Sequence, residues 1–325
     1  MNDDEELEVI FASGDGNIHV RTGNNGSLVW MFQTGGVIDS SPAVGDLDED
    51  GTLDVLIGES GGGDCYFYAI NGENGVLLWK YVIEGGLEES SPAVSDLDGD
   101  GKLEVAFGIP ARDPNFFVLN GEDGSLLWEF RAKNALLGTS PAVGDLTGDG
   151  RLNVVFQSTY QPGFFGTIYM LDGETGSLLW TRNMTEHTYM SSPSLYDIDN
   201  DGKLDVIIGS GDDHMYALNG EDGAVLWKYK TPGNIWSSPA LGDIDLDGQV
   251  EVIFGSTSGR KVYALDGEDG SLRWTYKTAL GGYSSPALGD IDGDNRLDVV
   301  VGRWDGNLYA INGEDGSGLW TYQTA

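Results

Sequence analysis

The chain has 325 residues, with 53 acidic residues against 17 Lys and Arg and a formal net charge of −36. This balance argues against nucleic acid and anionic membrane surfaces as partners, because each phosphate contact would have to overcome the field of the whole chain. Cys65 is the only cysteine, so no intrachain disulfide can form. No apolar run approaches the ~18–20 residues of a membrane span, and we expect no membrane insertion.

A tryptophan motif recurs along the whole chain. It is clearest as Asn-Gly-Glu-Asp-Gly-Ser-Leu-Leu-Trp at residues 120–128, and its seven copies are 46 to 52 residues apart. Each unit contains four short β-type runs separated by Gly, Asn and Asp, as at 239–244, 250–255, 261–266 and 271–277. Seven such units predict an all-β, seven-bladed β-propeller of four-stranded blades. We expect one domain, 1–325, with units at 1–37, 38–86, 87–136, 137–188, 189–234, 235–281 and 282–325.

The tryptophan of each unit is expected to be a packing residue. A large indole that returns once per blade is best explained by burial between adjacent blades. The residues predicted to be buried in this way are Trp79, Trp128, Trp180, Trp227, Trp274 and Trp320.

A second motif places acidic residues at alternating positions between the first two strands of a unit. Asp96, Asp98 and Asp100 occupy positions 1, 3 and 5, and Glu104 occupies position 9. Calcium takes six to eight oxygen ligands, and alternate residues of a tight loop can turn their carboxylates inward. A glycine at position 6 allows the sharp bend, and the carbonyl of position 7 adds a neutral oxygen. The loop resembles that of an EF-hand, but a strand follows it.

Six loops follow this register, and positions 1, 3, 5 and 9 hold 22 of the 53 carboxylates. Five are expected to bind calcium strongly and the third more weakly, because it has two carboxylates instead of four. Asn295 replaces the glycine of the last loop and should adopt the same left-handed conformation. In chain order, the expected ligand positions are Asp46, Asp48, Asp50, Thr52, Asp54; Asp96, Asp98, Asp100, Lys102, Glu104; Asp145, Thr147, Asp149, Arg151, Asn153; Asp197, Asp199, Asp201, Lys203, Asp205; Asp243, Asp245, Asp247, Gln249, Glu251; and Asp290, Asp292, Asp294, Arg296, Asp298.

The two motifs resemble two known repeat families. Ser-Pro-Ala-Val-Gly-Asp-Leu-Asp-x-Asp-Gly-x-Leu-Asp-Val resembles the FG-GAP/VCBS repeats of integrin α-subunit propellers and of many bacterial and archaeal surface proteins. The Asn-Gly-Glu-Asp-Gly-x-x-Leu-Trp half is similar to the tryptophan-docking motif of PQQ-like propeller repeats. The resemblance implies bound calcium and a scaffold outside the cell or at its surface, although residues 1–6 lack the features of a secretion signal.

The first unit lacks the first strand of the others. It begins at residues 7–11, which match their second strand, and the chain stops before a replacement appears. We expect an open edge, covered by solvent, by a further segment of a longer chain or by a strand from a neighbouring chain. A further segment would make the protein a module of a larger surface protein, whereas a neighbour's strand would make it a structural subunit of an assembly.

The sequence contains no phosphate-binding loop, His-Glu-x-x-His or Cys-x-x-Cys motif, and we expect no enzyme activity. A quinoprotein-like or carbohydrate-active enzyme is the alternative.

Residues that vary among the units lie before each Ser-Pro and between the second and third strands, at the end of the blades opposite the calcium loops. Varying loops on a constant scaffold favour a protein or glycan ligand there, although neutral drift would also produce them. The expected partner residues are Tyr160, Phe164, Phe165, Met190, Trp236, Tyr283, Arg303 and Trp304.

Overall fold

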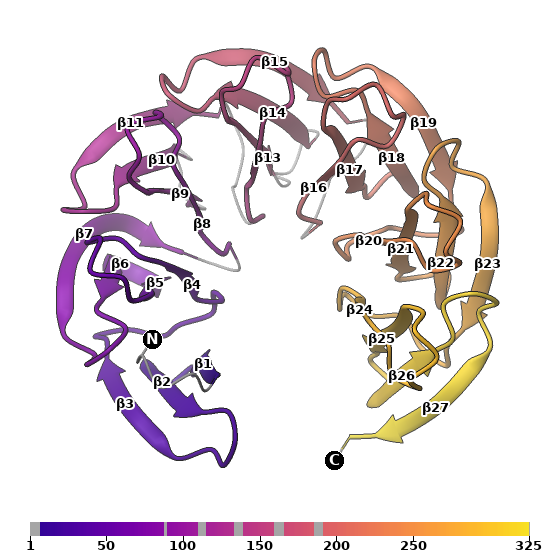
Figure 1. Ribbon diagram of the computed structural model, residues 1–325, viewed down its shortest axis with the longest axis horizontal. Coiled ribbons are helices and arrows are strands. Elements are labelled where there is room, and N and C mark those ends of the chain that lie inside the picture. The colour runs from indigo at the N-terminus through magenta and orange to yellow at the C-terminus, as the bar shows by residue number, and fades with distance from the viewer. Residues whose placement is uncertain are drawn as a thin grey trace. The chain divides into compact units, whose positions relative to one another are not determined.

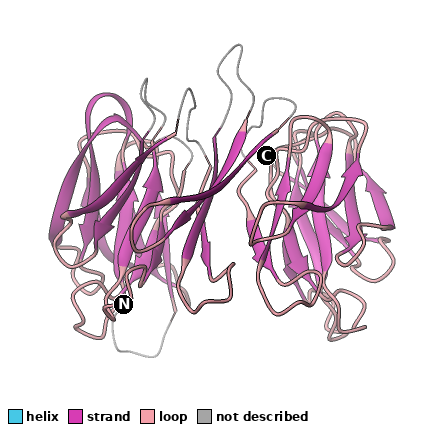
Figure 2. Ribbon diagram, turned by 90° about the horizontal axis from the view of Figure 1, so that it is seen from above, coloured by secondary structure: helices cyan, strands magenta, loops and turns pink. Residues whose placement is uncertain are grey.

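The computed structural model describes residues 7–87, 90–109, 115–132, 139–158, 166–184 and 191–324. The described residues form strands, turns and loops (Figure 2). They contain no helix that is long and apolar enough to cross a membrane. The predicted all-β class is therefore confirmed.

The strands form seven antiparallel sheets, each built from consecutive segments (Figure 1). The first sheet has three strands: β1 (Glu8–Ala12), β2 (Asn17–Thr22) and β3 (Leu28–Gln33). The other six have four strands, as expected: β4 (Ala43–Gly45), β5 (Asp54–Gly58), β6 (Ser60–Ile70), β7 (Leu77–Gly86); β8 (Ala93–Ser95), β9 (Glu104–Gly108), β10 (Asn115–Asn120), β11 (Leu126–Arg131); β12 (Ala142–Gly144), β13 (Asn153–Ser158), β14 (Thr167–Asp172), β15 (Leu178–Asn183); β16 (Ser194–Tyr196), β17 (Asp205–Gly209), β18 (His214–Leu218), β19 (Val225–Lys230); β20 (Ala240–Gly242), β21 (Glu251–Ser256), β22 (Lys261–Asp266), β23 (Leu272–Lys277); and β24 (Ala287–Gly289), β25 (Asp298–Gly302), β26 (Asn307–Ile311), β27 (Gly318–Gln323).

The order of strands within a sheet determines where its loops lie. In the sixth sheet β20 pairs with β21, β21 with β22 and β22 with β23, all antiparallel. The second strand is the most buried, and every residue of β21 is buried. Antiparallel pairing places the acidic loop between the first and second strands at one end of the sheet. The turn between the second and third strands is at the other end, as predicted.

The chain divides into two compact units. The first comprises residues 1–143, 151–164 and 170–178, and the second comprises 144–150, 165–169 and 179–325. The fourth sheet contributes to both. The expectation of a single domain stays a prediction.

The repeated tryptophan docks each sheet on the turn of the next. The Trp128 indole donates from Nε1 to the carbonyl of Gly173 at 2.8 Å. It also lies against Gly176, where a side-chain Cβ would be 2.6 Å from the ring and φ is +67°, so only glycine fits without strain. The same indole-to-carbonyl bond joins Trp30 to Gly72, Trp79 to Gly121, Trp180 to Gly220, Trp227 to Gly267 and Trp274 to Gly313.

The prediction of a buried Trp320 is wrong. Its side chain is 43% exposed, whereas Trp79, Trp128 and the other docked tryptophans are 7–9% exposed. Each docked indole packs on the sheet that follows it in the chain, whereas Trp320 lies on β27, the last of the described strands. Trp30, which was not among the predicted residues, is buried because the second sheet follows it.

Candidate metal centres

Five groups of carboxylates lie close enough together to hold a metal ion. Each group is on a loop between the first and second strands of a sheet, and its ligand oxygens all lie within 4.8 Å of one another. The groups are Asp46, Asp48, Asp50; Asp96, Asp98, Glu104; Asp197, Asp199, Asp205; Asp243, Asp245, Glu251; and Asp290, Asp292, Asp294. The sequence predicted all five of these loops.

The carboxylate at position 1 shapes each loop from within. Asp96 Oδ2 accepts the N–H of Gly101 at 3.1 Å, and Asp96 Oδ1 accepts that of Gly99 at 2.8 Å. Gly101 has a φ of +94°, and Asn295 takes its place in the last loop with a φ of +68°. The expectation that Asn295 adopts the left-handed conformation is confirmed.

Positions 3 and 5 each use one carboxylate oxygen to bend the backbone. Asp98 Oδ1 accepts the N–H of Asp100 at 3.1 Å, and Asp100 Oδ1 accepts that of Lys102 at 2.8 Å. These are Asx turns, which leave the second oxygen of each carboxylate free to face a cation.

Position 9 is the buried member of the set, and its role differs among the loops. Glu104 accepts the N–H of Leu97 at 2.7 Å, and it belongs to its acidic group. Asp54 uses both oxygens, accepting from Leu47 at 3.0 Å and from Gly72 at 3.1 Å, and it lies outside its group. Asp298 likewise accepts from Ile291 and Gly313. Asp205 accepts from Ile198 and Gly220 in the same way, although it belongs to its acidic group. In these three loops, the position 9 aspartate ties the loop to the next turn.

Burial raises the pKa of four position 9 carboxylates, and neighbouring acids add to the effect. The pKa of Asp54 and of Asp205 rises to about 6, and that of Glu104 and of Glu251 to about 7. The backbone N–H donors of each loop oppose this rise. A divalent cation would also favour the ionised form, since metal binding and proton release are coupled.

Three buried carboxylate oxygens at these loops have no hydrogen-bond partner in the described part of the chain. Two are Asp46 Oδ1 and Asp197 Oδ1, both on position 1, and the third is Glu251 Oε1, which has Arg273 Nη2 at 3.3 Å as a charged neighbour. A buried acceptor without a hydrogen bond costs free energy unless something neutralises it. Hard oxygen donors of this kind fit calcium, so the residues present are compatible with the expected ion.

The Asp243–Glu251 loop differs from the others because an arginine enters it. Arg273 donates from Nη1 to Asp245 at 2.6 Å and from Nη2 to Asp247 at 2.9 Å. Its Nη2 is also 3.3 Å from Glu251 and 2.9 Å from Asp266. These carboxylates raise the pKa of Arg273, Asp247 contributing most. Sequence reasoning did not assign this residue, although the position before the tryptophan is apolar in every other unit.

Position 7 was expected to contribute its carbonyl, and that role stays a prediction. The side chains at this position act elsewhere. Lys102 forms an ion pair with Glu122 at 2.5 Å, and Arg151 with Glu174 at 3.0 Å. Lys203 pairs with Glu221, and Arg296 with Glu314. Thr52 instead donates to Asp50 at 2.6 Å, and Gln249 accepts from Asn200.

The third loop is the least acidic. Asp145 accepts the N–H groups of Gly148 and Gly150 at 2.7 and 2.8 Å, which is the same local geometry as in the other loops. Asn153 is buried, and Thr147 and Asn153 replace two carboxylates. With only two acids left, the loop forms no group of three among the described residues.

Of the predicted partner residues, Tyr160, Phe164, Phe165 and Met190 lie outside the described residues. The other four come together in the second unit. The ring centroids of Trp236 and Tyr283 are 4.7 Å apart, and those of Tyr283 and Trp304 are 4.3 Å apart. Arg303 is adjacent to Trp304 and is buried.

Consecutive four-stranded antiparallel sheets, each docked on the next by a tryptophan, define a β-propeller repeat protein. A family model described as outer membrane protein assembly factor BamB matches residues 5–195, 68–239 and 164–325. The chain therefore belongs to this family of PQQ-like repeats. The PQQ-like part of the expected resemblance is confirmed, and the FG-GAP/VCBS part stays a prediction.

Solved structures show the same fold. BamB from Moraxella catarrhalis has a TM-score of 0.69 and 19% identity over 99% of this chain and 86% of its own. The computationally designed Ika8 protein has a TM-score of 0.72 and 16% identity, covering 98% and 84%. The biofilm matrix protein Bap1 of V. cholerae has a TM-score of 0.68 and 13% identity, covering 99% and 78%. No curated protein sequence matches the chain.

Proposed function

We propose that this protein is a calcium-stabilised, non-enzymatic β-propeller that serves as an extracellular binding or adhesion scaffold. The observation that carries the proposal is the recurrence of five acidic groups at one loop position, with buried, unpartnered oxygens on Asp46 and Asp197. Calcium accepts many oxygen ligands in irregular geometry, whereas magnesium requires a near-octahedral set and keeps its water. These loops correspond to the half of the repeat that resembles FG-GAP/VCBS repeats.

The loops are not equivalent as calcium sites. Arg273 enters the loop that carries Asp245 and Asp247 and supplies a cation from within the chain. Among the described residues, no basic side chain enters any of the other four groups in this way. We therefore assign the tight sites to the loops that begin at Asp46, Asp96, Asp197 and Asp290. The Asp243 loop and the acid-poor Asp145 loop would bind more weakly.

The proposed location and the absence of catalysis have separate support. The two weaker loops suit a calcium-rich medium, because sites in extracellular modules fill at dissociation constants of about 10⁻⁴–10⁻³ M. The matched family is described as an outer membrane protein assembly factor, and one similar structure is a biofilm matrix protein; both descriptions agree with a place outside the cytoplasm. The carboxylate clusters, once bound to calcium, are acceptor-only groups that cannot act as general acids.

Thermal unfolding in calcium and in EDTA tests the metal proposal. Calcium should stabilise the fold by mass action, by about 2.7 kcal/mol at a hundredfold excess over Kd, and the melting temperature should rise accordingly. Asp98→Asn should reduce this rise, whereas the matched control Glu129→Gln removes an exposed carboxylate outside the loops and should leave it unchanged. Identical melts in calcium and EDTA would refute the metal role.

A second candidate function, that of a structural subunit, is favoured by the first sheet. That sheet has three strands with β1 at its edge, while each of the other six has a further strand beside the equivalent position. A peptide with the sequence of residues 284–291, which form a first strand and its flanks, should bind this edge if a neighbouring strand completes the sheet. No saturable binding of the peptide would count against this candidate.

A further inference from the structure

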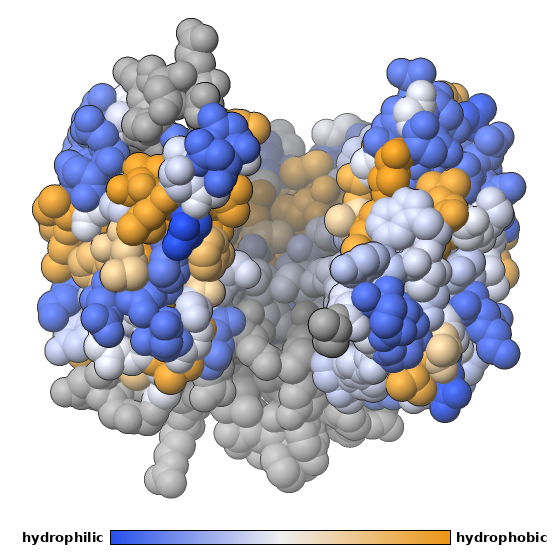
Figure 3. Space-filling model, turned by 90° about the horizontal axis from the view of Figure 1, so that it is seen from below, coloured by the Kyte–Doolittle hydropathy of each residue, from blue (hydrophilic) through white to orange (hydrophobic). Residues whose placement is uncertain are grey.

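Three aromatic side chains form a continuous strip on the second unit, at the end of its sheets opposite the acidic loops. We call Trp236, Tyr283 and Trp304 the aromatic strip. Trp304 is 53% exposed and Tyr283 is 37% exposed, although each is in ring contact with its neighbour. On the face shown in Figure 3, hydrophilic side chains alternate with apolar patches. Exposed aromatic rings held in mutual contact provide a rigid apolar surface for a ligand.

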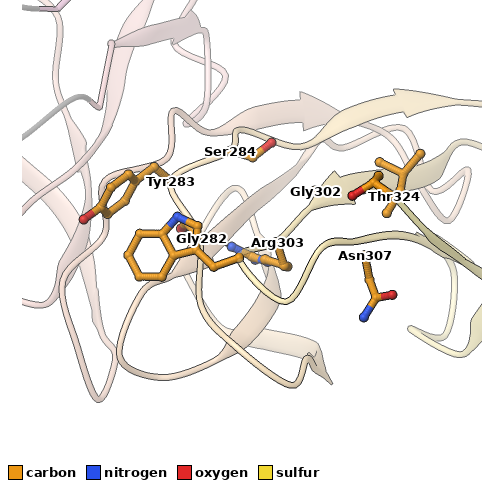
Figure 4. Close-up of a pocket in the computed structure, with 9 residues that line it drawn as sticks. Gly282, Tyr283, Ser284, Gly302, Arg303, Asn307 and Thr324 are labelled. Atoms are coloured by element: carbon orange, nitrogen blue, oxygen red, sulfur yellow. Dashed lines mark hydrogen bonds between the residues drawn. The ribbon is translucent and has the colours of Figure 1, made fainter.

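The aromatic strip separates two adjoining cavities, of about 320 and 370 Å³. Tyr283 and Trp304 line both. In the first cavity Tyr283 lies at one end and Asn307 and Thr324 at the other, with Arg303 between them (Figure 4). The second is lined by Trp236 and by polar groups that include Asn234, Thr257, Ser258 and Arg260. Both volumes fall in the range of small-molecule sites, about 300–1,000 Å³.

Arg303 gives the first cavity a cationic wall. Its side chain is only 6% exposed, and its hydrogen bonds to the carbonyls of Gly282 and Lys261 are long, at 3.3 and 3.4 Å. Its Nε has no hydrogen-bond partner, and no carboxylate forms an ion pair with it within the described ranges. Burial lowers the pKa of Arg303 to about 10, an effect that the charge of Asp305 opposes. A buried cation without a counter-ion is costly, so an anionic ligand group would stabilise this site.

Arg260 adds a second guanidinium, on the exposed side of the second cavity. The whole chain has only 17 basic residues against 53 acidic ones. Two arginines beside the aromatic strip therefore contrast with the net negative charge of the chain as a whole. A guanidinium is planar and can donate two parallel hydrogen bonds, so these side chains favour recognition of a carboxylate.

We propose that the aromatic strip and its two cavities bind an acidic oligosaccharide, with sugar rings stacked on Tyr283 and Trp304 and a uronate carboxylate held by Arg303 or Arg260. A pyranose ring has an apolar face of C–H groups and a rim of hydroxyls, which matches aromatic rings surrounded by Asn, Ser and Thr. Two adjoining cavities that share their aromatic wall fit two consecutive sugars better than a broad protein interface. This inference rests on the proposed function, because it names the ligand class of that scaffold.

Calorimetric titration of the calcium-loaded protein with trigalacturonic acid tests the proposal. We expect saturable binding that weakens at least tenfold in Trp304→Ala and at least fivefold in Arg260→Gln. The methyl ester of the same trisaccharide removes the charge and keeps the rings, so it should bind at least tenfold more weakly than the acid. Trp320→Ala removes an exposed tryptophan of the same unit outside both cavities, and it should bind like the wild type.

Arg303→Gln tests the buried cation, and circular dichroism establishes whether that variant folds. Arg260→Gln and Trp304→Ala change exposed side chains, so the test does not depend on Arg303 alone. Absence of saturable binding to the acid, or equal binding of acid and ester, would overturn the proposal; binding of a peptide ligand at the strip without sugar binding would do the same. A calcium-dependent melt in the same samples separates the two proposals, because the scaffold stands if calcium stabilises a protein that binds no sugar.

Discussion

The Asp96–Glu104 and Asp243–Glu251 loops have the same acidic pattern but different neighbours. Both carry aspartates at positions 1, 3 and 5 and a buried glutamate at position 9. In both, that glutamate accepts the N–H of position 2, and burial raises its pKa to about 7. Of the two loops, only the Asp243–Glu251 loop receives a guanidinium, which comes from Arg273. The equivalent residue of the sheet that carries the Asp96–Glu104 loop is Leu127.

The difference shows that an acidic loop can be neutralised in two ways. A crowded set of carboxylates is destabilised by mutual repulsion, and a cation must offset it. Arg273 supplies that charge from within the chain, whereas the Asp96 loop must take it from solution. A shared motif therefore does not imply a shared demand for metal.

The largest expected effect comes from breaking the docking of the sheet that carries the Asp96 loop, without changing the charges of that loop. Trp128→Ala should lower the free energy of unfolding by about 3–5 kcal/mol, since a buried aromatic core residue is lost. The loss should be equal in calcium and in EDTA, as measured by urea denaturation. Trp320→Ala is the matched control, and because Trp320 is exposed its effect should be below about 1 kcal/mol. Equal losses in both variants would contradict the docking role.

Arg273→Leu should remove the difference between the two loops, because the Asp243–Glu251 loop would then lack an internal cation, as the Asp96–Glu104 loop does. In EDTA, the buried Oε1 of Glu251 would lose its cationic neighbour, and we expect a destabilisation of about 1–3 kcal/mol from this unsatisfied oxygen. Calcium should recover most of this loss, because the vacated loop can then bind the ion. Melting curves with and without calcium measure both effects. A loss that calcium does not reduce would show that Arg273 acts only through packing.

Leu127→Arg makes the reverse change. The new guanidinium should reach the carboxylates of the Asp96 loop, so the rise in melting temperature caused by calcium should become smaller than in the wild type. Leu127→Met keeps the length without the charge and serves as control. If both variants respond to calcium like the wild type, the internal cation cannot replace the metal in this loop.

The smallest effect concerns position 4 of the two loops. Leu246 has a φ of +65°, whereas Gly99 occupies the same position with +77° in the other loop. A left-handed conformation costs a non-glycine residue about 1–2 kcal/mol, of which the flexibility of glycine in the unfolded chain cancels roughly half. Leu246→Gly should therefore stabilise the protein by roughly 0.5–1 kcal/mol in urea denaturation, and Gly99→Leu should destabilise it by a similar amount. A destabilised Leu246→Gly would mean that the leucine side chain makes contacts that outweigh the strain.

Much of the fold and of the loops follows from local sequence rules. The period of the tryptophan motif predicted seven sheets, and the absence of a Ser-Pro-Ala run before Leu7 predicted that the first sheet has three strands. The 1, 3, 5, 9 register located all five acidic groups, because these positions are set by the loop backbone itself. The variation before Ser-Pro also selected Trp236 and Tyr283, whose rings are in contact with each other, and Tyr283 also contacts Trp304.

The features that sequence reasoning missed depend on contacts between separate segments. Arg273 is 22 residues beyond Glu251, so its entry into the loop requires the pairing of β21, β22 and β23. Its one local signal was a charged residue at a position that is apolar in the other units. The exposure of Trp320 was also missed, because the repeat pattern shows where an indole recurs but not what packs against it.

Counting tightly bound calcium ions in the wild type and in Arg273→Leu tests the central claim most directly. Titration of the apo protein in competition with a chromophoric chelator gives the number of ions that each variant binds. We predict four tight ions in the wild type, one for each acidic group that Arg273 does not enter, and a fifth in the variant. Equal numbers in the two proteins would contradict the role of Arg273, and the absence of any competing calcium would contradict the metal-stabilised scaffold itself.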